Sequence, residues 1–336
     1  STSELIPARV GMGRVPCALR VNGLFIRGSL TMTKTASNVS WLHRFGSLVA
    51  VMAFALYITG VLASGATPNF LATLWTTPGA SNPSFTAPPP RYAHAFMVLG
   101  ATVCVLSVIL ALWLWKSNYQ RYLKNLGMIT VGVFLVVALV VLSPLHNLFP
   151  VAASVGYALG IQIFFCLTVC LALFTRADWR WDELKMPDLE SPSMRQVLVF
   201  TTTAVFVQPL LAEGFRKKEI GIAPHLVLGI AATACSLWIL EMALTKFSHL
   251  RAFKISAVFL AQVVGLQLFL GIISLSMNLN ARAVPGPQPG LVVMNVTQAA
   301  VGILALVTSL FVTCQGFKYF GPPGDGTFSA MLSDRQ

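Results

Sequence analysis

Charged residues are scarce in this sequence. Lysine, arginine, aspartate and glutamate make up 10% of its 336 residues, whereas a soluble domain carries about 25%. Hydrophobic residues make up 56%, and the mean hydropathy is +0.74. Such a chain has too few polar side chains to cover its surface in water. The composition therefore excludes an ordinary soluble globular protein and predicts an integral membrane protein.

Several functional signatures are also missing. Basic clusters interleaved with aromatic residues are absent, so the net charge of +12 does not indicate nucleic-acid binding. The six cysteines contain no C-x-x-C motif, which removes support for a zinc or thioredoxin-like site. Five of them lie in apolar segments, where they act as small apolar residues. Paired helices broken by Gly or Pro are lacking too, which argues against a transporter.

What the sequence does contain is eight apolar segments, each long enough to cross about 30 Å of hydrocarbon, the short fifth only marginally. They span about residues 41–64, 92–115, 126–142, 151–174, 197–212, 221–244, 257–275 and 291–314. Four segments precede a charged stretch and four follow it. The predicted fold class is all-α: a polytopic membrane protein whose eight transmembrane helices form two pseudo-repeated four-helix bundles.

The charged residues divide the chain further. The predicted parts are a basic N-terminal arm (1–40), an N-terminal bundle (41–174), a charged cytoplasmic linker (175–196), a C-terminal bundle (197–320) and a tail (321–336). The basic loops place both termini on the cytoplasmic or matrix side. The arm is a transit segment, sequence upstream of a start at Met32, or a docking arm. The membrane is the bacterial inner membrane, or the mitochondrial inner membrane if the arm is a transit segment.

His225 is the leading candidate for a functional residue. It lies about one turn into the sixth segment, after Pro224, and an ionisable ring at that depth is a functional candidate. The alternative is a packed or interfacial histidine. His94, Tyr157 and Gln298 occupy similar depths in the other even-numbered segments, and histidines on paired helices hold heme in bundles. Arg216, at the end of the fifth segment, suits a heme propionate or lipid headgroups.

Several stretches resemble the heme A synthase family over about residues 41–320. They are Leu42-His43-Arg44-Phe45, Ala153-Ser154-Val155-Gly156-Tyr157, Gly221-Ile222-Ala223-Pro224-His225 and Leu266-Gln267-Leu268-Phe269-Leu270-Gly271. The resemblance implies two four-helix bundles, each with a pair of heme-ligating histidines. One bundle holds a heme b, and the other holds the substrate heme O, whose methyl group is oxidised to a formyl group. A glutamate beside the substrate-side ligand belongs to the same pattern.

This sequence departs from that pattern at the reactive positions. The glutamate position holds Ala93, and three ligand positions hold Phe96, Tyr157 and Gln298. His225 retains the ligand type. Phenylalanine has no atom that binds iron, and an alanine cannot move protons at a reacting methyl group. We therefore assign no catalytic residue.

The resemblance then implies a degenerate heme A synthase-like protein. It would be a non-catalytic structural or accessory subunit of a membrane redox or photosynthetic complex. At most one heme b, or another tetrapyrrole, would bind, with His225 on the iron. The other cofactor-binding candidates are His94, Tyr157, Gln298 and Arg216. The alternative is an active heme A synthase for cytochrome oxidase assembly, with ligands relocated to His94, His225 and Tyr157. The expected partners are the lipid bilayer and other membrane subunits, and not nucleic acid.

Overall fold

The apolar segments are helical because hydrocarbon offers no water to pair with backbone amides, so each segment must satisfy its own backbone. The computed structural model describes residues 26–66, 90–117, 119–143, 148–176, 179, 185–186, 188, 191–216, 220–281 and 289–321. Within α1, α3, α6, α7 and α9, the side chains of 26–40, 65–66, 90–93, 150–151, 216 and 278–281 lie outside this description. Residues 322–336 of the predicted tail and 1–25 of the predicted arm lie outside it as well.

The described ranges form eight helices. They are α1 (Ile26–Ala66), α3 (Pro90–Lys116), α4 (Arg121–Leu142), α6 (Pro150–Phe174), α7 (Met194–Arg216), α8 (Ala223–Thr245), α9 (Arg251–Ala281) and α10 (Pro289–Tyr319). Each is long and apolar enough to cross a membrane. In the same ranges the only β pairing is one isolated parallel bridge, between Met186 and Phe320. The predicted fold class is confirmed.

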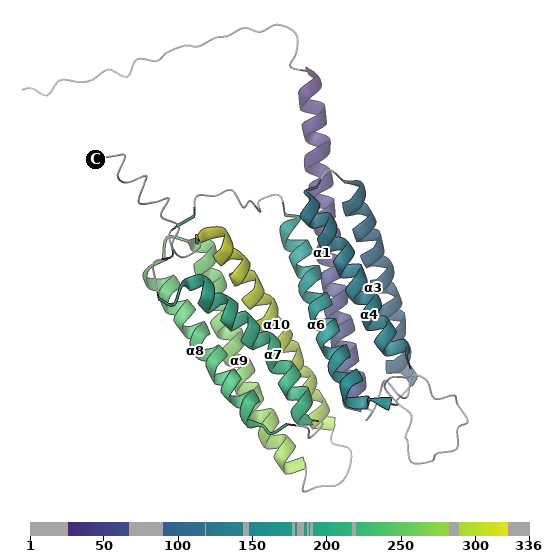
Figure 1. Cartoon of the computed structure of the whole chain (residues 1–336), viewed down its shortest axis with the longest axis vertical. Coiled ribbons are helices and arrows are strands. Elements are labelled where there is room, and N and C mark those ends of the chain that lie inside the picture. The colour runs from purple at the N-terminus through teal and green to yellow at the C-terminus, as the bar shows by residue number, and fades with distance from the viewer. Residues whose placement is uncertain are drawn as a thin grey trace, which may run out of the picture.

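The eight helices form two groups of four (Figure 1). In the first group, neighbouring pairs are α1–α3, α3–α4, α4–α6 and α6–α1; in the second, they are α7–α8, α8–α9, α9–α10 and α10–α7. The order of neighbours around each bundle is therefore the same. It leaves α3 diagonal to α6 and α8 diagonal to α10. Each half of the chain repeats one architecture.

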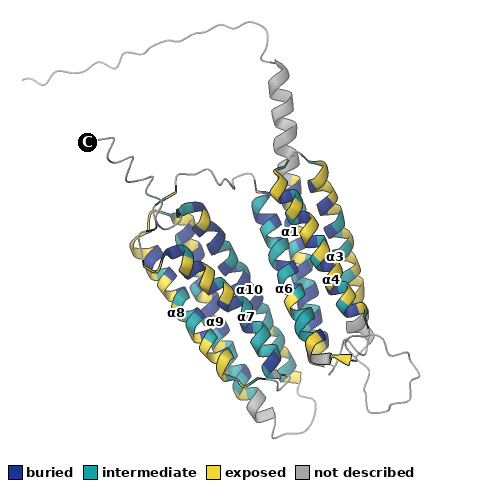
Figure 2. Cartoon of the chain, in the orientation of Figure 1, coloured by how far each residue is buried: buried dark blue, intermediate teal, exposed yellow. Residues whose placement is uncertain are grey.

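Large apolar side chains also lie on the outside of the bundles. Val136 and Leu139 of α4 have 60% and 66% of their surface exposed. Exposed residues line the outer faces of the helices, and buried residues face the interior (Figure 2). An outer surface of this kind suits lipid chains rather than water. The helices thus describe an integral membrane protein in contact with a bilayer.

The two bundles meet through helices that occupy equivalent places. α1 packs against α10, and α6 packs against α7 and α10. Ser154 of α6 donates a hydrogen bond to Oε1 of Glu213 in α7 at 2.8 Å. The thiols of Cys170 in α6 and Cys314 in α10 are neighbours. One apolar core runs through both bundles.

The segment between the bundles is attached to the second bundle. The Met186 N–H donates to the Tyr319 carbonyl at 2.8 Å, and the Gly321 N–H donates to the Met186 carbonyl at 2.8 Å. The bundle end at which this segment lies is called the linker end below, and the opposite end is called the far end. Figure 1 shows the linker end at the top.

Asp188 lies in the same segment and caps α7. Its Oδ1 and Oδ2 accept hydrogen bonds from the N–H groups of Met194 and Arg195 at 3.0 and 3.1 Å. Ser193 and Gln196 form a capping box, in which each side chain bonds the other residue's N–H. These groups satisfy donors that a helix start leaves without partners. α7 therefore begins at Met194, inside the predicted linker.

Candidate functional site

His225 is the third residue of α8. The helix begins with Ala223 and Pro224, where a proline costs nothing because its missing N–H has no partner in the first turn. The half-buried imidazole lies with Nδ1 at 3.1 Å from the Gln208 carbonyl oxygen in α7. A carbonyl oxygen only accepts, so Nδ1 carries the proton. The lone pair is then on Nε2, which is the tautomer of a metal-ligating histidine.

A pair of glutamine amides lies deeper in the second bundle, between α7 and α9. Nε2 of Gln267 in α9 donates to Oε1 of Gln208 in α7 at 3.2 Å, and both side chains are buried. Oε1 of Gln267 has no hydrogen-bond partner within the part of the chain that the structure describes. A buried acceptor without a partner costs roughly 1–3 kcal/mol. It is therefore a place where a ligand N–H or O–H would stabilise the bundle.

Glycines make room for these amides. A β-carbon on Gly229 of α8 would lie 2.6 Å from Nε2 of Gln208, and one on Gly302 of α10 would lie 3.2 Å from Nε2 of Gln267. A β-carbon on Gly271 of α9 would lie 3.4 Å from Nε2 of Gln298. Each amide thus lies against the backbone of a neighbouring helix. The Gln298 amide is directed toward α9.

In the first bundle, the equivalent space is filled by two rings. Phe96 of α3 and Tyr157 of α6 lie on diagonal helices, and their centroids are 6.1 Å apart in an edge arrangement. The Tyr157 hydroxyl lies against Gly60 of α1 and has no hydrogen-bond partner among the described residues. Phe96 is 5% exposed. This packed pair offers no ligand atom at Phe96, so the first bundle does not fit a tetrapyrrole at this position.

The two remaining predicted residues lie elsewhere. His94 precedes Phe96 by two residues, which places it about 200° around α3. It is exposed, on the outer face of the bundle. The side chain of Arg216 lies outside the described residues. Among the predicted cofactor-binding residues, Tyr157 therefore packs against Phe96, and His225 bonds to α7.

Sequence reasoning missed Gln208, Gln267 and Glu213. The first two had a visible signal, since each is a polar side chain within an apolar segment. Glu213 had none, because the predicted fifth segment ends at residue 212. α7 instead continues to Arg216, and Glu213 bonds to Ser154 across the two bundles. An acidic residue ends an apolar run in the sequence, but it does not end the helix.

The described part of the chain offers no metal site made of protein groups alone. The described residues contain no group of three or more His, Cys, Asp or Glu side chains that would hold a metal ion. One histidine instead suits a metal that a cofactor already ligates on other sides, as a tetrapyrrole does. No family model matches the sequence, and no curated protein matches it. The resemblance to heme A synthases therefore stays a prediction.

Proposed function

We propose that this membrane protein holds one heme b, or another tetrapyrrole, on His225 in its second bundle. In this proposal the protein is a heme A synthase-like but non-catalytic structural or accessory subunit of a membrane redox or photosynthetic complex. The observation that supports it is the bond between Nδ1 of His225 and the Gln208 carbonyl. Such a bond orients a ligand imidazole and places its lone pair on Nε2.

The donor set around His225 suits one tetrapyrrole. Nε2 of His225 would bind the iron of this group. When bound, a heme supplies one-electron chemistry. The Phe96–Tyr157 pair fills the corresponding space in the first bundle. One cofactor per chain, and not two, is the stoichiometry that these packings support.

Among the described residues, no carboxylate is placed as an acid or base beside His225, which supports a non-catalytic role. The described carboxylate at the far end of α7 is Glu213, five residues from Gln208. Five residues correspond to about 140° around a helix, so Glu213 faces away from the His225 side. It is already bonded to Ser154 in α6. No described carboxylate beside His225 takes the role of the glutamate that Ala93 replaces in the family pattern.

We infer the orientation in the membrane from charge. The cations with described side chains lie at the linker end of the membrane spans or in the segment between the bundles: Arg44, Lys116, Arg121, Lys124, Arg176, Lys185, Arg195, Lys246, Arg251, Lys254 and Lys318. The positive-inside rule then places this end on the cytoplasmic or matrix side. The membrane is the bacterial inner membrane or the mitochondrial inner membrane.

The test is the absorption spectrum and heme content of the purified full-length protein during a redox titration. We expect one b-type heme signal per chain in the wild type. His225→Ala removes the iron ligand, so its heme content should fall at least tenfold. His249→Ala is the matched control, because His249 is exposed in the turn after α8. Two heme signals per chain, or full heme content in His225→Ala, would overturn the proposal.

The proposed lack of heme A synthase activity has its own test. The gene is expressed in a strain that lacks heme A synthase, and the hemes are extracted and separated. We expect heme O to accumulate without heme A. Formation of heme A would show that the chain oxidises the methyl group, and the accessory role would then be wrong.

A further inference from the structure

The two bundles separate toward the linker end. Arg195, Val199, Phe206 and Glu213 are spaced by four and seven residues, so they share one face of α7. Glu213 contacts α6 at the far end, which shows that this face is turned toward the first bundle. Val199 on the same face is nevertheless 44% exposed. α6 and α7 are therefore in contact at the far end and apart at the linker end.

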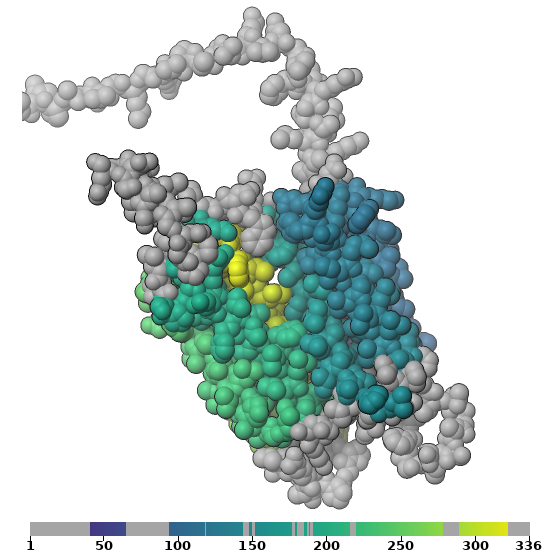
Figure 3. Space-filling view, in the orientation of Figure 1, coloured from purple at the N-terminus to yellow at the C-terminus, as the bar shows by residue number. Residues whose placement is uncertain are grey.

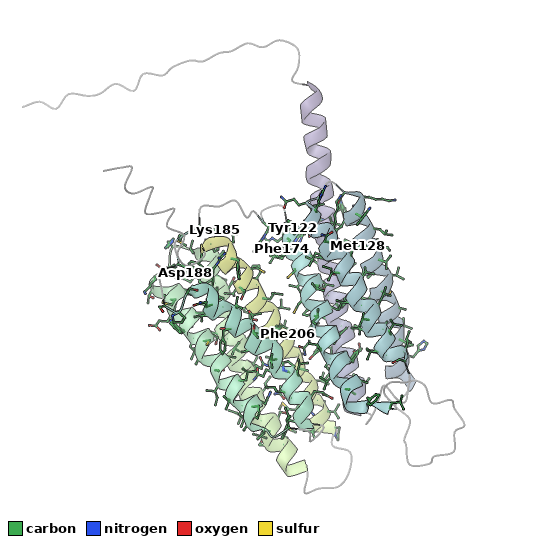
Figure 4. The ribbon with its side chains drawn as sticks, viewed as in Figure 1. Tyr122, Met128, Phe174, Lys185, Asp188 and Phe206 are labelled. Carbon is green, nitrogen blue, oxygen red and sulfur yellow. The ribbon has the colours of Figure 1, made fainter. Side chains whose placement is uncertain are left out.

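The space between them is called the linker-end cleft below; it is lined by Arg195, Val199 and Phe206 of α7 and by Phe317 of α10. Figure 3 shows a hollow between the two bundles, with atoms of α10 (yellow) at its base. Phe317 is 36% exposed, although α10 is central in the molecule. Figure 4 labels Phe206 on the side of α7 toward the first bundle. The side chains below Arg195 on this face are mostly apolar.

Arg195 lies at the mouth of the cleft. Its guanidinium carbon is 4.5 Å from the centroid of the Phe317 ring. Its Nε is buried without a hydrogen-bond partner, and Arg195 forms no ion pair with any described residue. The nearest capping carboxylate, Asp188, accepts from the backbone N–H groups of Met194 and Arg195 instead. A guanidinium over a ring that forms no ion pair with a described carboxylate is suited to bind an anion.

We propose that the linker-end cleft binds an anionic phospholipid of the bilayer. The guanidinium of Arg195 binds the headgroup phosphate, and an acyl chain lies along Val199 and Phe206. The distance along α7 from Arg195 to Phe206 is about 16 Å, at 1.5 Å per residue. This is close to the half-thickness of the hydrocarbon, about 15 Å. A charge at the headgroup level and an apolar wall that reaches the midplane match one leaflet of a phospholipid.

The described cations around the cleft favour an anionic lipid over a zwitterionic one. Arg176 and Lys185 are exposed at the linker end, and Nζ of Lys318 lies 5.7 Å from the Trp179 ring centroid. A zwitterionic headgroup brings its own ammonium group, which these cations repel. An anionic headgroup carries net negative charge, which they attract. This inference does not depend on a tetrapyrrole at His225.

The experiment uses the full-length protein, delipidated in detergent. Phosphatidylglycerol or phosphatidylcholine with identical acyl chains is added back, and bound lipid is counted by native mass spectrometry. We expect the wild type to retain phosphatidylglycerol about tenfold better, which corresponds to one charge-assisted contact. Equal retention of the two lipids by the wild type would overturn the proposal, and this comparison needs no variant.

Two variants locate the site. Arg195→Gln should lower phosphatidylglycerol retention about tenfold, because it removes the charge and keeps a polar side chain. The matched control is Arg44→Gln, since Arg44 also lies at the linker end and over a ring, at 5.4 Å from the Trp41 centroid. Val199→Trp keeps the charge and fills the apolar wall, so it should also lower retention. Unchanged retention in Arg195→Gln or in Val199→Trp contradicts binding in the cleft.

Discussion

At the scale of single residues, one hydroxyl decides how the first bundle packs. The Tyr157 hydroxyl lies against the backbone of Gly60 and has no hydrogen-bond partner in the described part of the chain. A β-carbon at Gly60 would also lie 3.3 Å from Cε2 of Phe96. Glycine is needed here for close approach and not for an unusual backbone conformation. These three residues form one packed unit between α1, α3 and α6.

The first prediction concerns this unit. Gly60→Ala should destabilise the protein by about 2 kcal/mol, because the added carbon overlaps the Tyr157 hydroxyl. Tyr157→Phe should be close to neutral, since the hydroxyl that it removes is unpaired. The double variant should recover most of the loss. Thermal unfolding in detergent measures all three, and a double variant no more stable than Gly60→Ala would contradict this packing.

The residue scale also shows the limit of sequence reasoning at the candidate site. That His225 lies on a helix near one membrane surface could be predicted, because Pro224 and the apolar run after it mark the start of that helix. Its hydrogen bond to Gln208 could not be predicted. The bond requires a particular rotation of α8 against α7, and main-chain carbonyls occur at every position of both helices.

At the scale of elements, α7 begins earlier and ends later than the sequence predicts. The apolar run indicates a helix over residues 197–212, whereas the structure has Met194–Arg216. The added first residues are held by Asp188 and by the Ser193–Gln196 capping box. The S-x-x-Q spacing was visible in the sequence, but the contribution of Asp188 depends on the fold of the linker.

The second prediction tests this cap. Asp188→Ala should destabilise the protein by about 1–2 kcal/mol, the usual loss for a helix N-cap, because two N–H groups of α7 lose their acceptor. Amide hydrogen exchange should accelerate in the first turn of α7 and remain unchanged in α9. Lys185→Ala is the control, since Lys185 is exposed and its loss should change stability by less than about 0.5 kcal/mol. Equal exchange in both variants would contradict the role of Asp188.

At the scale of the whole molecule, the two bundles are related by a repeated order of helices. α1 meets α10 as α7 meets α6, and α6 and α10 meet near the centre. The pair Cys170 and Cys314 marks this central contact near the linker end. In the sequence, the two cysteines look like any small apolar residues of a membrane helix. Only the meeting of α6 with α10 makes them neighbours.

The third prediction uses this pair as a probe of the interface. Copper phenanthroline should convert the two thiols into a disulfide, with loss of two protons and with two electrons passing to Cu(II). After cleavage at a protease site inserted between residues 180 and 184, the halves should then migrate together without reductant and separately with it. Cys314→Ser should abolish the link, whereas Cys104→Ser should not. Separate migration of the oxidised wild-type halves would contradict the contact.

The sequence by itself determined the fold class and the approximate membrane segments. Apolar runs of this length are stable in a bilayer as helices, because only a helix satisfies every backbone group within its own segment. The tertiary structure alone decided which polar side chains meet. Gln298 lies toward Gly271, Tyr157 toward Gly60, and Glu213 toward Ser154. The physical reason is that these helices are apolar on all sides, as a bilayer requires. Their sequences therefore carry little periodic signal of which face turns inward, and the rotation of each helix is set by packing against its neighbours.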